Sequence, residues 1–237
     1  MEASDLLLRA AAVLGYPIGL VLRAHYRWLS RSGASHPNPW IRKSSEIGGW
    51  LLEGEHEFLW ELACRPGAGP ILEIGSWMGK SSCILAGACA QASPESRVFC
   101  VDPFDMKGPF VQEWYHRLFI HRDAGGTYSE FLRHADRLGF RRWAVPVPAR
   151  SEAILPFLKP GFRMVFIDAG HTYSEVRRDA GLSLPLLSPG GVLALHDAAG
   201  PTAWPGIARY VREDLMRSPS LRPLGSRRSI VAFEKTA

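Results

Sequence analysis

The stretch of residues 71–82, ILEIGSWMGKSS, constrains the fold of this chain more than any other. A short apolar run ends in an acid and two spaced glycines, and an apolar pattern of helical period follows directly. Gly75 lets the chain turn sharply, and Gly79 permits close approach of a ligand or a second backbone. The segment therefore predicts a buried parallel strand, a tight turn and a helix whose N-terminal N–H groups face a crevice. Open α/β sheets hold nucleotide-like ligands at such turns.

The glycine spacing narrows the choice of ligand. A dinucleotide fingerprint requires a glycine where Trp77 stands, so NAD and FAD are disfavoured. A P-loop requires four residues between its glycines, and Gly75 is one residue too close to the Gly79-Lys80-Ser81 sequence. An ordinary strand–helix turn without a ligand remains an alternative at this point.

Composition indicates one α/β domain with a short appendage, because the chain has 237 residues and 46% of them are hydrophobic. The net charge of +5 comes from scattered arginines rather than a basic run, so nucleic-acid binding is not expected. None of the cysteines forms a C-x-x-C pair, and their apolar surroundings indicate reduced, buried thiols in a cytoplasmic protein; they are Cys64, Cys83, Cys89 and Cys100.

We expect residues 1–43 to form an N-terminal helical extension with a linker, and residues 44–237 to form the domain. The uncharged run from Ala10 to Leu22 is 13 residues long, whereas a membrane span needs about 20. No signal peptide is expected. Arginines and aromatic residues flank the run, so residues 6–29 either pack on the domain or a second subunit, or lie at the inner face of a membrane as a peripheral contact.

Alternating apolar segments and turn signals predict a series of strands and helices along the domain. The expected strands are 71–74, 98–101, 143–147, 162–167, 192–195 and 229–233, and the expected helices include 44–63, 128–140, 175–187 and 207–216. The aromatic-rich residues 103–126 fit no period and predict a binding loop for an acceptor substrate or a helical insertion.

Acidic residues follow several of these strands. Asp102 ends the second strand, where a carboxylate can accept hydrogen bonds from both ribose hydroxyls of an adenosine, although a turn before Pro103 would also use it. Asp168 and Asp197 follow the fourth and fifth strands. If these strands are neighbours, their ends lie about 4.8 Å apart, and two carboxylates at that distance repel unless a proton or cation lies between them. Mg²⁺ or Mn²⁺ suits such oxygen ligands and would lower the pKa of an acceptor hydroxyl.

Histidine and serine complete the candidate chemistry. His171 lies three residues past Asp168, and a neutral imidazole there can act as general base for a hydroxyl; a histidine that only hydrogen-bonds its loop is the alternative. His196 precedes Asp197 and offers a nitrogen ligand to the same cation. Ser151 is expected to cap the helix that follows the third strand.

Two motifs together resemble a known family. The pattern Glu-x-Gly-x-x-x-Gly over residues 73–79 looks like motif I of class I S-adenosylmethionine-dependent methyltransferases. Residues 166–173, FIDAGHTY, and 186–197, LLSPGGVLALHD, resemble the subfamily of sugar and natural-product O-methyltransferases, which usually shows I-D-G-x-H-x-Y followed by L-x-P-G-G-x-x-x-x-H-D. The resemblance covers roughly residues 44–234. Ala169-Gly170 replaces the usual Gly-x, and His196 replaces the first member of an acidic pair found in metal-dependent members.

The resemblance implies a doubly wound, mostly parallel α/β sheet in the order 3-2-1-4-5-7-6 with the last strand antiparallel. It implies that S-adenosylmethionine lies over the glycine turn, with the first acid of the motif near the methionine amino group, the second-strand acid on the ribose and the serine after the third strand beside the adenine. The implied cofactor-binding residues are Glu73, Gly75, Ser76, Gly79, Ser81, Asp102, Ser151 and Asp168. The implied catalytic residues are His171 and Asp168, and the implied metal ligands are Asp168, His196 and Asp197.

The predicted function is S-adenosylmethionine-dependent O-methylation of a sugar or hydroxylated natural product, a small-molecule acceptor. A non-catalytic S-adenosylmethionine-binding module, membrane-associated through residues 6–29, is the alternative. A nucleic-acid methyltransferase ranks last because Asp168-Ala169-Gly170-His171 stands where base methylators carry an N/D-P-P-Y-type motif. Related enzymes often assemble, so a homo-oligomer is also expected.

Overall fold

A seven-stranded sheet forms the centre of the computed structural model, which describes residues 33–105, 126–201 and 203–236. Its strands are β1 (Ile71–Ile74), β2 (Val98–Asp102), β3 (Ala144–Pro148), β4 (Phe162–Ile167), β5 (Leu187–Leu195), β6 (Leu221–Arg227) and β7 (Ile230–Lys235). The order is β3-β2-β1-β4-β5-β7-β6, and β7 is antiparallel to both of its neighbours. The predicted fold class and strand order are confirmed.

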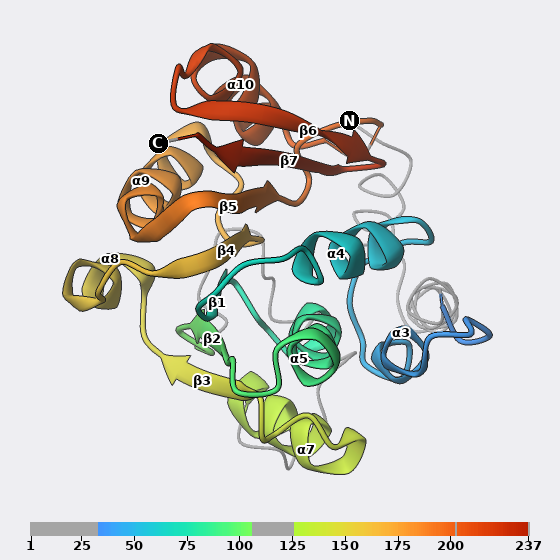
Figure 1. The fold of residues 1–237 in the computed structure, drawn as a ribbon. Coiled ribbons are helices and arrows are strands. Elements are labelled where there is room, and N and C mark those ends of the chain that lie inside the picture. The colour runs from blue at the N-terminus through green and yellow to red at the C-terminus, as the bar shows by residue number, and fades with distance from the viewer. Residues whose placement is uncertain (1–32, 106–125, 202, 237) are drawn as a thin grey trace, which may run out of the picture.

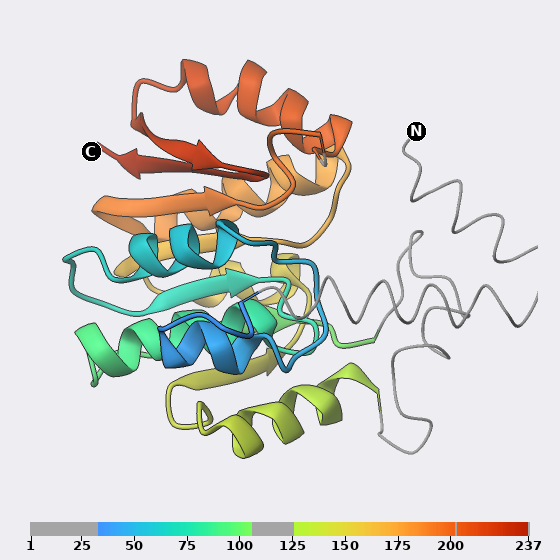
Figure 2. The same cartoon turned by 90° about the vertical axis from the view of Figure 1, so that its right-hand side faces the viewer.

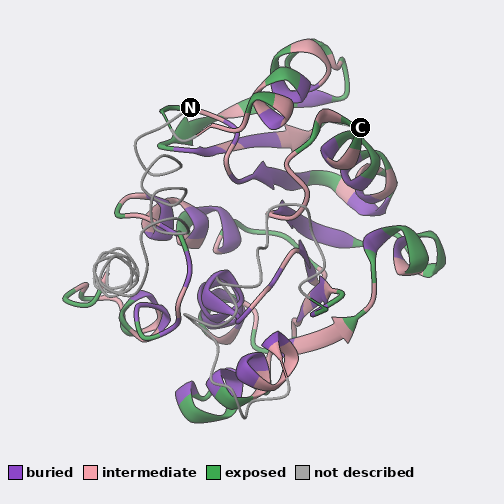
Figure 3. Ribbon diagram, turned by 180° about the vertical axis from the view of Figure 1, so that it is seen from behind, coloured by how far each residue is buried: buried purple, intermediate pink, exposed green. Residues whose placement is uncertain are grey.

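Helices cover both faces of the sheet (Figure 1). One face carries α3 (Pro39–Ser44), α4 (Glu55–Ala63), α5 (Lys80–Ala92) and α7 (Thr127–Leu138), and the other carries α8 (Ser151–Ile154), α9 (Tyr173–Ser183) and α10 (Pro205–Glu213). Successive side chains of each strand point to opposite faces of the sheet, so Ile71 belongs to one hydrophobic cluster and Leu72 to the other. Both clusters are closed to solvent, and burial is concentrated on the strands and the sheet-facing sides of the helices (Figure 3).

The expected helix over residues 44–63 is wrong in its first half. The chain forms α3, then an irregular segment, and only then α4. Gly49 and Gly54 have φ angles of 152° and 88°, which an L-residue rarely adopts and which interrupt a helix. α3 begins at Pro39, after Asn38 caps it by accepting a hydrogen bond from the Trp40 N–H at 2.9 Å.

Proline and glycine also shift other boundaries. The helix expected over 175–187 ends at Ser183, because Pro185 diverts the chain into a 3-10 turn before β5. β5 is longer than expected for the same reason. β6 did not appear in the apolar pattern, since it contains Pro223 and Gly225 and lies exposed at the sheet edge.

The carboxyl ends of the parallel strands meet at one edge of the sheet (Figure 2). One hydrogen bond beyond each strand continues the ladder: Gly75 N to Val101 O at 2.9 Å, Asp168 N to Ile74 O at 2.8 Å, and His196 N to Ile167 O at 3.0 Å. Gly75, Asp168 and His196 therefore stand in a row at this edge. β1 connects to β2 through α5 on one face, whereas β4, its other neighbour, is reached through α8 on the opposite face. The strand order reverses at this point, which is where open α/β sheets bind ligands.

Two predictions fall outside the described residues: the membrane or subunit contact through residues 6–29, and most of the aromatic segment 103–126. Within the part of the chain that is described, none of the helices combines the length and apolar character that crossing a bilayer requires.

Candidate active site

The turn after β1 depends on its glycines. Gly75 and Gly79 have φ angles of 88° and 92°, and Trp77 between them also has a positive φ of 44°. A Cβ atom on Gly75 would lie 2.0 Å from the Asp168 carbonyl oxygen, so no other residue fits where β1 and β4 end side by side. The turn thus places the start of α5 directly beside the loop that follows β4.

Glu73 is fully buried under this turn. Its carboxylate accepts hydrogen bonds from the hydroxyls of Ser76 at 2.7 Å and Ser81 at 2.5 Å, and from Ser82. Burial raises the pKa of Glu73, while the serine hydroxyls oppose that shift. Three of the predicted cofactor-binding residues, Glu73, Ser76 and Ser81, therefore bond to one another and fix the turn to α5.

Asp102 closes the turn from the side of β2. Its Oδ2 accepts hydrogen bonds from the backbone N–H groups of Ser76 and Trp77, each at 2.9 Å, and its Oδ1 accepts from Phe104 N–H at 2.6 Å. Burial raises the pKa of this carboxyl, against the effect of the three amides. Each carboxylate oxygen can accept two hydrogen bonds, so Oδ1 retains acceptor capacity for a ribose hydroxyl.

Ser151 does not cap α8, contrary to expectation. Arg150 occupies the N-cap position, and the Ser151 hydroxyl donates to Asp179 Oδ1 on α9 at 2.5 Å. Burial raises the pKa of Asp179, and the hydrogen bond from the Ser151 hydroxyl opposes that shift. This hydroxyl joins two helices, and its place beside an adenine stays a prediction.

The predicted catalytic residues are brought together beyond β4 and β5. His171 Nε2 lies 3.2 Å from Asp197 Oδ2, and His196 Nδ1 lies 3.1 Å from Asp168 Oδ1 and 3.5 Å from Asp197 Oδ1. His171 also packs on Trp204, with ring centroids 4.6 Å apart. His171 and Asp197 are 26 positions apart in the sequence, with α9 and β5 between them, so the strand order determines this contact.

A divalent cation fits a different set of residues from the one expected. Ligand atoms of Asp168, His171 and Asp197 lie within 4.8 Å of one another, and two carboxylates with an imidazole suit Mg²⁺ or Mn²⁺. His196 is not part of this group. Its two ring nitrogens face carboxylates, Asp168 on one side and Glu55 on the other, and its expected role as a ligand stays a prediction.

The pKa of His196 is raised well above the usual range. Burial disfavours the charged ring, but the carboxylates of Asp168, Asp197 and Glu55 outweigh it. The same contacts lower the pKa of Asp197 and of Glu55 against the effect of burial. His196 therefore lies among three carboxylates that favour its charged form.

Sequence reasoning missed Glu55, Ser229 and Trp204. Glu55 accepts hydrogen bonds from Ser229 N at 3.0 Å and Ser229 Oγ at 2.7 Å, and the Trp204 N–H donates to Asp197 O at 2.9 Å. These residues come from α4, the start of β7 and the loop before α10, and no local motif links them. The one signal available in the sequence was an acid, Glu55, just before the apolar pattern of α4.

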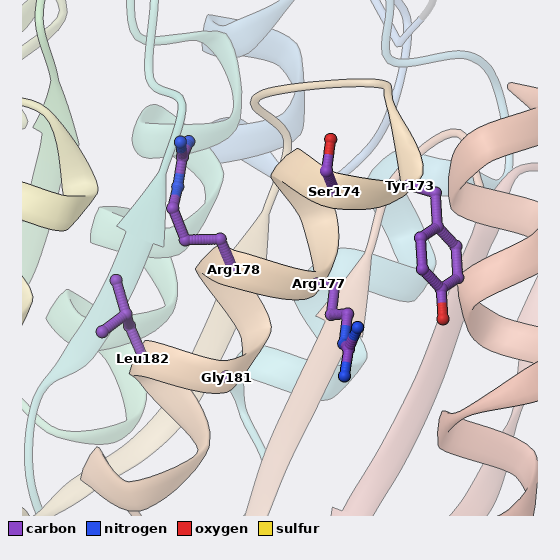
Figure 4. A pocket seen from close by; sticks show the side chains of 6 residues that line it. All are labelled: Tyr173, Ser174, Arg177, Arg178, Gly181 and Leu182. Carbon is purple, nitrogen blue, oxygen red and sulfur yellow. The ribbon is translucent and has the colours of Figure 1, made fainter.

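A separate groove runs along the outward side of α9 (Figure 4). Its lining residues are Tyr173, Ser174, Arg177, Arg178, Gly181 and Leu182. None of them is a predicted site residue, so this groove is distinct from the crevice at the carboxyl edge.

A family model described as a methyltransferase domain matches residues 72–198 of this chain. The uncharacterized protein y4gI of Sinorhizobium fredii is 26% identical over 175 residues, which cover 73% of this chain but 18% of that much longer protein. Its activity as a whole therefore says nothing about this chain.

Solved methyltransferase structures share the fold. The O-methyltransferase TomG from Streptomyces achromogenes, in complex with S-adenosylmethionine, superposes with a TM-score of 0.58 at 18% identity, over 90% of this chain and 96% of its own. An O-methyltransferase from Bacillus cereus, in complex with S-adenosylhomocysteine, gives 0.56 at 18% identity over 90% and 97%. Likeness at this identity shows the fold.

Proposed function

Because this chain belongs to the methyltransferase-domain family that its residues 72–198 match, we propose that it methylates a hydroxyl group of a sugar or another hydroxylated natural product. It is an S-adenosylmethionine-dependent methyltransferase. The proposal of an oxygen acceptor rests on the site, where His171 and the carboxylates of Asp168 and Asp197 lie beside the turn of residues 75–79, called here the cofactor turn.

The contact between His171 and Asp197 carries the proposal. A carboxylate only accepts hydrogen bonds, so at 3.2 Å the Asp197 Oδ2 atom fixes the proton of His171 on Nε2. Neutral His171 then has its lone pair on Nδ1, and this is the atom that would take the proton from an acceptor hydroxyl. Asp197 would stabilise the imidazolium that forms, as the acid of a catalytic triad does for its histidine.

Little else is required of the protein. Transfer of an activated methyl group to oxygen is an in-line displacement, in which holding the two reactants at the right distance supplies much of the rate. Asp102 would hold the donor by its ribose. Asp168, with a side chain 29% exposed, lies between that turn and His171. If a divalent cation binds, Asp168, His171 and Asp197 would hold it and it would polarise the acceptor oxygen; His171 would then be a ligand in place of the base.

The first experiment measures S-adenosylhomocysteine binding by calorimetry, to the wild-type protein and to Asp102→Ala, with and without Mg²⁺. We expect binding that is lost in the variant, with Asp136→Ala on α7 as a control because this aspartate is exposed. An absence of binding to the wild-type protein would overturn the proposed donor. A change in affinity with Mg²⁺ would support the cation.

The second experiment measures transfer of labelled methyl from S-adenosylmethionine to a panel of glycosides, phenols and amines. Methylation confined to hydroxylated compounds would support the proposal. Transfer to amines alone would contradict it. Intact donor binding with no transfer to any compound would favour the non-catalytic binding module.

A further inference from the structure

We propose that Glu55 is a positioning residue for methyl transfer, because its one carboxylate holds both the side chain of His196 and, through Ser229, the backbone of Asp197. Glu55 lies on α4, ahead of the first strand and outside the residues that match the family model. The inference rests on the proposed function, in which Asp197 orients the base His171.

Glu55 reaches the site through two sets of contacts, called here the first and the second arm. The first arm is the contact of Glu55 Oε2 with His196 Nε2, 3.4 Å away. The other ring nitrogen of His196 faces Asp168 and Asp197. Because the ring is held at both ends by acceptors, rotating it would break its contacts with Asp168 and Glu55. His196 is 4% exposed, so water does not replace a lost contact at low cost.

The second arm runs through Glu55 Oε1, which accepts from Ser229 Oγ at 2.7 Å, while Ser229 Oγ accepts from Asp197 N–H at 3.3 Å. A hydroxyl has one proton, so donating it to Glu55 turns the lone pairs of Ser229 toward Asp197. Asp197 has a φ of 54°, an unusual value for this residue that the surrounding contacts must maintain. Asp197, which contacts His171, is thus held in this backbone conformation by Ser229, and Ser229 is held by Glu55.

Glu55 is itself held firmly. Leu52 N–H donates to Oε2 at 2.8 Å and Ser229 N–H donates to Oε1 at 3.0 Å, and the side chain is 1% exposed. Four donors fix the position of this buried carboxylate, so it in turn fixes the positions of His196 and Ser229. Helix α4 and the start of β7, far apart in sequence, are joined by this group.

Two substitutions separate the arms. In Glu55→Gln the amide oxygen would stay on Ser229, which offers two donors, and the amide N–H₂ would face His196 and the Leu52 N–H as a donor. The first arm therefore breaks, together with the Leu52 contact, and the second arm stays. Ser229→Ala breaks the second arm and leaves His196 in place. Glu61→Gln removes the same charge from the exposed side of α4 and is the matched control.

The experiment compares these variants in three measurements: S-adenosylhomocysteine binding, the side-chain N–H signals of His196 by NMR (assigned with His196→Gln), and methyl transfer to an acceptor found in the panel. We expect Glu55→Gln to bind S-adenosylhomocysteine as the wild type does and to lose or shift the Nε2–H signal. We expect kcat to fall about 100-fold without a change in KM, as a small misplacement of a base can cause. Ser229→Ala should lower kcat less, and Glu61→Gln should change nothing.

The positioning role is overturned if Glu55→Gln keeps the wild-type signal and turnover. It is also overturned if both variants lose S-adenosylhomocysteine binding together with Tm, since the group would then serve the fold alone. If the panel gives no acceptor, the proposed function fails, and the NMR signal still decides whether Glu55 holds His196.

Discussion

At the scale of single residues, the site consists of three carboxylates that contact two histidine rings. Between them, His171 and His196 contact Asp168, Asp197 and Glu55, but the two histidines differ in exposure: the side chain of His171 is 26% exposed, whereas that of His196 is 5% exposed. Only the more exposed ring can meet an acceptor. This difference favours His171 over His196 for the proposed base role.

We predict that His171→Ala keeps S-adenosylhomocysteine binding and loses turnover by a factor of about 10²–10⁴, the usual contribution of a general base. The reason is that His171 contacts Asp197 and Trp204, whereas the proposed donor site depends on Asp102. Calorimetry and methyl transfer measure the two effects. Full turnover in this variant would remove His171 as the base, and His36→Ala, remote from the site, is the control for loss of an imidazole.

His56 gives a prediction for stability against pH. It is fully buried with neither ring nitrogen hydrogen-bonded among the described residues, and burial, with Lys80 nearby, lowers its pKa to about 4. The unfolded chain binds a proton near pH 6.5, so folding stability is complete above that pH and falls as pH drops toward 4. Between pH 7.5 and 5 this loss amounts to about 2 kcal/mol.

His56→Leu removes the titrating group. Urea unfolding of both proteins at pH 7.5 and pH 5 should show the variant gaining about 2 kcal/mol relative to wild type at the lower pH. An equal change with pH in the two proteins would show that His56 becomes charged without penalty.

At the scale of elements, the glycine turn and α9 set the distances within the site. Gly75 lets β1 and β4 end side by side, and Thr172 caps α9 directly after His171, with Glu175 completing a capping box. The base therefore lies between a strand end and a helix start, both fixed by backbone hydrogen bonds.

We predict opposite effects for alanine at two glycines. Gly75→Ala would drive a Cβ into the Asp168 carbonyl, and the strand end must move, so both S-adenosylhomocysteine affinity and Tm should fall. Gly181→Ala lies inside α9 with no atom within 4 Å of the new Cβ, and should stabilise by about 0.5–1 kcal/mol. Calorimetry and urea unfolding measure both. A neutral Gly75→Ala would show that the turn relaxes freely.

At the scale of the whole molecule, the sheet is sandwiched between two hydrophobic clusters, and the site lies where its strands end. β7 is inserted between β5 and β6, which brings Ser229 to the site from near the end of the chain. Stability of the C-terminal strands and geometry of the site are therefore coupled.

Phe233 tests this coupling. It is fully buried on β7 opposite Leu193, so Phe233→Ala should lower the free energy of unfolding by about 3–5 kcal/mol. Met216→Ala is the control, because Met216 is 57% exposed and should cost little. Urea unfolding decides. A cost as small as that of the control would mean that β7 contributes little to the fold.

The sequence by itself determined six of the seven strands and the glycine turn, because these depend on short-range signals, and the family resemblance implied the strand order. Apolar runs bounded by glycine give strands, and the spacing of Gly75 and Gly79 excludes pyrophosphate-binding turns. It also identified Asp102, Asp168, His171 and Asp197, since acids and histidines at strand ends meet at one edge whatever the intervening helices contain.

Only the tertiary structure decided how these groups share protons. His196 is predicted as a metal ligand because it stands between an apolar strand and Asp197, and only the structure shows that its ring also faces Glu55, whose carboxylate favours the charged form. Glu73 and Ser151 likewise looked available to a ligand, and both are bonded to neighbouring helices. The order of residues fixes which groups reach the edge, whereas contacts between distant elements fix their charge and orientation, because these depend on partners that no local pattern contains.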